Sequence, residues 1–120
     1  MAQTEHQGTL AGSEWVLTEL SGEAVPDSSK AMLQFRGEGA LAGHSGCNRF
    51  SGTWNVDGGR LMLNPGAMTR MACPGPQMRL EYQFIQTLAG TSTWTRDGIN
   101  LTLENASGDV LARLRQTDWD

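Results

Sequence analysis

The amino-acid sequence predicts an α+β domain that is mostly β, built as a curved antiparallel sheet or a partly open β-barrel with one packed α-helix. Three observations lead to this prediction. Fifteen Gly and four Pro residues are spread along the 120-residue chain, and short apolar runs of strand length lie between them. One segment carries apolar side chains at helical spacing. The chain length suits a single hydrophobic core, because two cores would leave each half too small to be stable.

The first half of the chain predicts five strands. Trp15–Leu20 contains the β-branched and aromatic residues that favour strands, and Ser21-Gly22-Glu23 ends it. Val25–Ala31 contains Pro26 and is interpreted as an irregular surface connection. The other four strands are expected at residues 32–35, 40–44, 49–56 and 60–64.

Two turns organise the strands between residues 40 and 64. Ser45-Gly46-Cys47-Asn48 predicts a tight turn, and Asp57-Gly58-Gly59 predicts a hairpin, because its residues tolerate positive φ. In the strand between these turns, Phe50, Thr53 and Trp54 do not alternate strictly. Gly52 within that strand indicates a bulge or the close approach of another backbone.

One helix is predicted, at Gln77–Leu88. Pro74 and Pro76 precede it and Gly90 follows it, as expected of a helix start and stop. An apolar stripe with a period of 3.6 residues should pack on the sheet; it consists of Leu80, Phe84, Ile85 and Leu88. The last three strands, at residues 91–95, 99–103 and 110–114, are expected to form a meander.

Three motifs in this order resemble the META domain, or HslJ-like, family of bacterial envelope proteins. They are Leu10–Trp15, Gly46–Gly52 and Met68–Pro74, the last leading into a helix that carries Glu81 and Phe84. The resemblance covers residues 10–114. It implies a compact β-rich domain with a packed helix, a place in the periplasm or on the outer membrane, an association with heat shock and stress, and no known enzymatic activity. The motif residues that we take as candidate binding positions are Gly46, Asn48, Arg49, Gly52, Thr69, Met71 and Glu81.

The domain is expected to span residues 10–116, between a flexible leader at 1–9 and a tail at 117–120. Met1-Ala2 is either a cloning remnant or a genuine start, and no signal-peptide core follows it. A net charge of −4, a pI near 5.0 and a mean hydropathy of −0.38 argue against nucleic acid as a partner and favour a soluble chain. No apolar run approaches the ~18 residues of a transmembrane helix. We expect a monomer without cofactor or metal.

Cys47 and Cys73 are open to four interpretations. A disulfide is favoured, because two cysteines in a small exported domain are most simply an oxidised pair. On the chain-entropy model it would stabilise the fold by about 3.5 kcal/mol. The alternatives are two reduced buried thiols, a metal site completed by His44, and a catalytic thiol with His44 as its base.

Several further residues have both a structural and a functional interpretation. Asn48 suits a tight turn, whereas Arg49 could reach an anionic ligand. Glu81 is favoured near a helix start by the helix dipole, and the sharper alternative is a buried pair with Arg49 or Arg70. Met62, Met68, Met71 and Met78 are expected to fill the core, with an apolar cavity as the alternative. The four Trp residues, at positions 15, 54, 94 and 119, are expected in the core or at its rim.

The sequence therefore predicts a non-enzymatic, stress-related accessory domain of the envelope. It would bind an unknown envelope protein or an apolar ligand in a groove between the helix and the curved sheet. Two alternatives stay open, a thiol-based enzyme or redox protein that uses Cys47 and Cys73, and a protease-inhibitor-like module.

Overall fold

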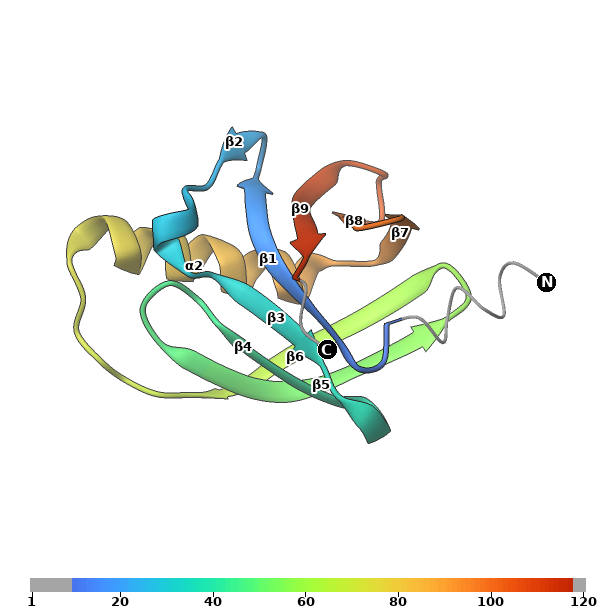
Figure 1. Ribbon diagram of the computed structural model, residues 1–120, viewed down its shortest axis with the longest axis horizontal. Helices are drawn as coiled ribbons and strands as arrows, with labels where there is room; N and C mark the ends of the chain where they lie inside the picture. The colour runs from blue at the N-terminus through green and yellow to red at the C-terminus, as the bar shows by residue number, and fades with distance from the viewer. Residues whose placement is uncertain (1–9, 118–120) are drawn as a thin grey trace.

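The computed structural model describes residues 10–117 and shows one sheet wrapped around a core, with one long helix (Figure 1). The predicted leader, the end of the predicted tail and Trp119 lie outside the described residues. The strands are β1 (Ser13–Leu20), β2 (Glu23–Ala24), β3 (Met32–Phe35), β4 (Ala40–His44), β5 (Arg49–Asp57), β6 (Arg60–Met68), β7 (Thr93–Asp97), β8 (Asn100–Glu104) and β9 (Val110–Gln116). The helix is α2 (Gly75–Gly90), and two short 3₁₀ turns are η1 (Asp27–Ser29) and η2 (Gly37–Gly39).

The described strands form one antiparallel sheet in the order β2-β1-β3-β4-β5-β6-β7-β8-β9, and a further pairing of β1 with β9 closes it into a ring. The ring is weakest between β6 and β7, where Arg60 and Thr93 are the one pair in register. Phe84 and Leu88 of α2 are fully buried in the same core as Trp15, Leu33 and the other inward side chains of the strands. The predicted mostly β fold with one packed helix is confirmed.

The long β5–β6 hairpin shows why Gly52 is a glycine. Phe50, Gly52, Trp54 and Val56 point inward while the residues between them are exposed, so the strand alternates strictly once Gly52 is counted on its inner face. A Cβ at Gly52 would clash with the backbone carbonyl of Asn64. The register also shifts between Phe50, which pairs with Met68, and Ser51, which pairs with Gly66. The bulge is therefore in β6, at Ala67, and the close backbone approach is at Gly52 of β5.

The structure corrects several predicted boundaries. Strand β6 continues through Pro65 to Met68, because β5 is its one ladder partner over this stretch of the described chain, where a proline is tolerated. Strand β2 was missed; Ser21 and Gly22 both have positive φ and form the two-residue turn that leads into it. Strand β7 begins at Thr93 rather than at residue 91, because Thr91 caps the helix through the Thr87 carbonyl.

Within residues 10–117, no helix combines the length and the apolar character that crossing a bilayer requires.

Candidate functional site

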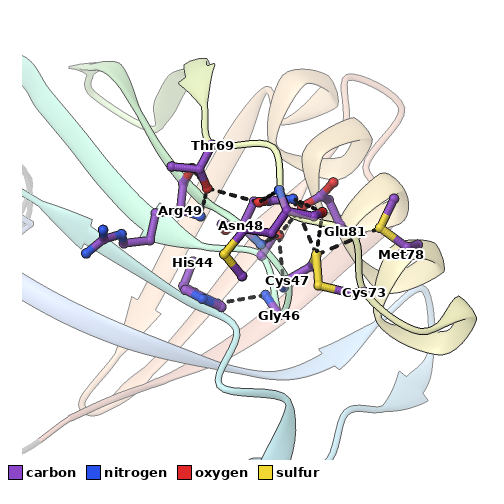
Figure 2. The surroundings of a disulfide bond; sticks show 11 residues. His44, Gly46, Cys47, Asn48, Arg49, Thr69, Cys73, Met78 and Glu81 are labelled. Atoms are coloured by element: carbon purple, nitrogen blue, oxygen red, sulfur yellow. Dashed lines mark hydrogen bonds between the residues drawn. A yellow bond between two sulfur atoms is a disulfide. The ribbon is translucent and has the colours of Figure 1, made fainter.

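Three segments that are remote in sequence meet beside the start of α2. They are the β4–β5 turn (residues 45–48), the loop between β6 and α2 (residues 69–74), and the second turn of α2 (Figure 2). Cys47 of the turn and Cys73 of the loop form a disulfide, with their Sγ atoms 2.05 Å apart and their Cα atoms 6.0 Å apart. Cys47 is buried, and Cys73 is half-buried. The turn is thereby fastened covalently to the loop that leads into the helix.

Asn48 joins the same three segments through its side-chain amide. Its Oδ1 accepts hydrogen bonds from the backbone N–H of Met71 at 2.6 Å and from the hydroxyl of Thr69 at 3.0 Å. Its Nδ2 donates to Glu81 Oε1 at 2.9 Å. Asn48 is 3% exposed, so these bonds are made away from bulk water, where an unsatisfied amide is costly. Asn48 therefore fixes the backbone of Met71 and links it to the helix residue Glu81.

Ser45 belongs to this cluster and was not singled out from the sequence. Its Oγ donates to Glu81 Oε1 at 2.6 Å and accepts from the backbone N–H of Asn48 at 3.0 Å. The signal that could have found it is its place at the start of a Ser-Gly-Cys-Asn turn, where a hydroxyl bonds the backbone that follows.

Glu81 does not make the pairing that was considered for it. Its carboxylate accepts from Ser45 and Asn48, and the ion pairs recorded for residues 10–117 include none to Arg49 or Arg70. Figure 2 shows the Arg49 side chain directed away from Glu81. Neutral donors therefore hold this carboxylate. Arg49 and Arg70 are exposed.

Thr69 and Gly46 hold the backbone of the site in position. The Thr69 hydroxyl accepts from the Arg49 N–H, and the Thr69 N–H donates to the Arg49 carbonyl, each at 3.0 Å. Gly46 has a φ of +101°, which favours glycine. A Cβ at Gly46 would also lie 3.0 Å from the Leu80 side chain. Gly52 acts further away, in the β5–β6 contact described above.

His44 does not lie in a thiol or metal arrangement in this structure. Its Nδ1 accepts the backbone N–H of Gly46 at 3.0 Å, and the described residues contain no free cysteine. Among residues 10–117, no three His, Cys, Asp or Glu side chains are placed to hold a metal ion together.

Three of the four methionines that were predicted to fill the core are exposed instead. Met71 is 58% exposed, Met78 is 42% exposed and Met62 is 67% exposed, while Met68 is half-buried against the core. Met71 lies in the irregular loop before α2, and Met78 lies on the first turn of α2. Tyr82, one helical turn beyond Met78, is 67% exposed and was also missed.

We call Met68, Met71, Met78 and Tyr82 the methionine surface. Its three methionines line a recess of about 670 Å³ together with Asn48, Arg70 and Glu81. Met78 Sδ lies 3.8 Å from Cys47 Sγ, so this methionine contacts the disulfide. Met62 is on β6 as well, but six residues before Met68, roughly 20 Å along the strand. Three of the four methionines for which the sequence left a cavity open thus line one recess, together with polar and charged side chains.

A second recess of about 490 Å³ lies between α2 and the segment that contains β2 and η1. Leu20, Val25, Pro26 and Leu80 are among its lining residues. It is a groove between the helix and the sheet, but of the motif residues only Gly46 lines it, whereas four line the first recess: Asn48, Thr69, Met71 and Glu81.

Arg96 lines neither recess, and its guanidinium group contacts other residues of the domain. Its guanidinium carbon is 4.9 Å from the centre of the Trp15 ring, and its Nη2 donates to Gln116 at 2.6 Å. Partial burial lowers the pKa of Arg96 below its ordinary value.

Comparison with known proteins gives both a family match and structural likenesses. A family model described as the META domain matches residues 8–118. Heat shock protein HslJ of Escherichia coli (strain K12) is 38% identical over 70 residues, which are 58% of this chain and 49% of that protein. The match thus spans about half the length of this relative.

Solved structures share the architecture over nearly the whole chain. An NMR structure of a protein from Burkholderia xenovorans has a TM-score of 0.75 at 23% identity and covers 96% of this chain and 88% of that one. The crystal structure of a DUF4847 family protein from Bacteroides vulgatus ATCC 8482 has a TM-score of 0.69 at 16% identity, with coverage of 95% and 99%. These two likenesses establish the fold alone.

Proposed function

The chain belongs to the META domain family, and from this premise we propose that it is a non-enzymatic accessory domain of the bacterial cell envelope that binds a partner protein through the methionine surface. The observation that carries the proposal is that exposed apolar side chains stand on a backbone that is rigidly held. Met71 and Met78 are exposed, yet the loop and helix that carry them are fixed by a disulfide and by the Asn48 amide.

The disulfide supports the proposed compartment. Disulfides persist in oxidising environments such as the periplasm and are rare in the bacterial cytosol. Cys47 and Cys73 are the two cysteines of the chain, and they are bonded to each other. An envelope location is consistent with this disulfide. The name of the HslJ relative, a heat shock protein, supports a stress-related role.

The methionine surface supports a binding role. Methionine is flexible and polarisable, and it is favoured at surfaces that accept varied apolar partners. Tyrosine is likewise enriched in interfaces, because it adds a large ring with a polar end. Clusters of exposed apolar side chains around a recess commonly mark interaction sites. A partner would find the recess already formed, because its walls are held by bonds within the domain.

No feature of the described residues favours the enzymatic alternative over this one. A thiol mechanism needs a thiolate near a base, whereas both sulfurs are in the disulfide and His44 accepts a backbone N–H. The protease-inhibitor-like role stays an alternative without a specific observation in its favour.

Photo-crosslinking in the native host tests the proposal. The full-length protein would carry a benzophenone amino acid at position 71 or 78, with position 62 as the matched control, since Met62 is equally apolar and at least as exposed. We expect a defined protein adduct from positions 71 and 78 and not from position 62. The purified partner should then bind the wild-type domain and the Met62→Asp variant, but not Met78→Asp.

Equal adducts from all three positions, no adduct from positions 71 and 78, or unchanged binding of the partner to Met78→Asp would each refute the proposal. Urea unfolding of both Asp variants controls for folding, because both positions are exposed and their stability should change little.

A further inference from the structure

The charges around the methionine surface have one dominant sign. The two segments that build the site, residues 45–52 and 66–90, hold three arginines, Arg49, Arg70 and Arg79, and one carboxylate, Glu81. The rest of the sequence has six basic residues against twelve acidic ones. A chain with a net charge of −4 therefore gathers positive charge where its apolar side chains are exposed.

The three arginines lie around the edge of the surface. Arg70 lines the recess beside Met68 and Met71. Arg49 lines a neighbouring hollow that also contains Met68 and Thr69. Arg79 lies three residues before Tyr82 on α2, so these two side chains are neighbours on the helix surface. All three arginines are exposed.

The one carboxylate in the site is occupied within the domain. Glu81 Oε1 accepts hydrogen bonds from Ser45 and Asn48, and Glu81 is half-buried in the lining of the recess, whereas the three arginines are exposed. An incoming anion would therefore meet more exposed positive charge than negative charge here, and each guanidinium group can bind a carboxylate with two parallel hydrogen bonds.

From this charge complementarity, and resting on the proposed function, we propose that the partner presents an acidic protein segment, in which apolar side chains that enter the recess are flanked by Asp or Glu that pair with Arg49, Arg70 and Arg79. A protein segment fits better than an anionic membrane, because the apolar side chains surround a recess of about 670 Å³, whereas a bilayer is met by a protruding apolar face.

Peptide display on the oxidised domain tests this inference. Random dodecapeptides would be selected for binding, synthesised, and measured by fluorescence anisotropy. We expect the selected peptides to be apolar and net negative, and to compete with one another. Their affinity should fall at least tenfold in Met78→Asp and stay unchanged in Met62→Asp.

The arginines are tested with a double variant and a charge-matched control. Arg70→Gln/Arg79→Gln should weaken peptide binding about tenfold and abolish most of its salt dependence. Arg60→Gln/Arg115→Gln removes the same net charge from exposed positions outside the site and should leave the affinity within twofold of wild type.

The outcomes separate the two proposals. Peptides that lose affinity in Met78→Asp but are neutral or basic, or that bind equally to the two double variants, would overturn the acidic segment and leave the proposed function standing. Selected peptides that bind Met78→Asp as well as wild type would overturn both. Binding of phosphatidylglycerol vesicles, lost in Met78→Asp, with no peptide selected at this surface, would assign a membrane as the partner and refute the protein segment.

Discussion

Asn48 is the residue through which the candidate site is held together. A carbonyl oxygen and an amide nitrogen on one short side chain reach the loop before α2 and the helix itself at the same time. An aspartate could not donate to Glu81, and a serine could not span both partners. Position 48 therefore requires asparagine because its neighbours need both an acceptor and a donor, and not only because the turn favours this residue.

Asn48→Ala should lower the free energy of unfolding by about 3 kcal/mol, because it takes the side-chain acceptor from the Met71 N–H and removes one of the two donors to the Glu81 carboxylate, which keeps Ser45. Urea unfolding followed by tryptophan fluorescence measures this change. Asn55→Ala is the matched control on an exposed position of β5, and it should change the stability by less than about 0.5 kcal/mol. An Asn48→Ala protein as stable as wild type would show that the amide does not hold the site.

At the scale of secondary-structure elements, the β5–β6 hairpin sets the position of the loop that carries Met71. Strand β6 leaves β5 at Met68, and its approach to β5 is closest where Gly52 faces the Asn64 carbonyl. The Thr69 and Arg49 backbones are then bonded to each other. A change in the spacing of the two strands would therefore reach the candidate site.

Gly52→Ala should destabilise the domain by about 3 kcal/mol, because the added methyl group meets backbone that cannot yield without separating the strands. Gly59→Ala is the control in the turn of the same hairpin; a Cβ there meets no atom within 4 Å, and its φ is not positive. Thermal unfolding of the two variants decides the point. Equal melting temperatures would contradict the close strand contact.

The elements were predictable where their signals are local. The helix, the hairpin at Gly58 and the order of the longer strands follow from turn residues and periodicity over a few positions. The pairing of β1 with β9 was not predictable, because it joins segments about a hundred residues apart and leaves no local signal in the sequence. The exposure of Met71 and Met78 was predicted wrongly, because hydropathy assigns methionine to the core whereas tertiary position decides its burial. The donors to Glu81 were missed, since nothing local distinguishes Ser45 and Asn48 from Arg49 and Arg70.

At the scale of the whole molecule, one disulfide links the β4–β5 turn of the sheet to the loop that leads into the helix. The disulfide closes a loop of 26 positions that contains the whole β5–β6 hairpin. A bond across such a loop restricts the unfolded chain more than the folded one.

Cys47→Ser/Cys73→Ser should lower the free energy of unfolding by about 3.5 kcal/mol. Urea unfolding with and without dithiothreitol measures it. The reductant should destabilise the wild type by a similar amount and leave the double variant unchanged, which separates loss of the bond from any effect of serine. A wild-type protein purified from its own host that contains two alkylatable thiols would contradict both the bond and the proposed compartment.

The central claim is that a surface fixed by Cys47, Cys73 and Asn48 receives a partner on its methionines, and methyl-labelled methionine spectra test it most directly. The six methionines give six methyl resonances, assigned by substitution. On titration with the cross-linked partner or with a selected acidic peptide, the signals of Met68, Met71 and Met78 should shift and saturate together, while those of Met62 and Met32 stay in place. Shifts at Met62 or Met32 in place of Met71 and Met78 would contradict the account.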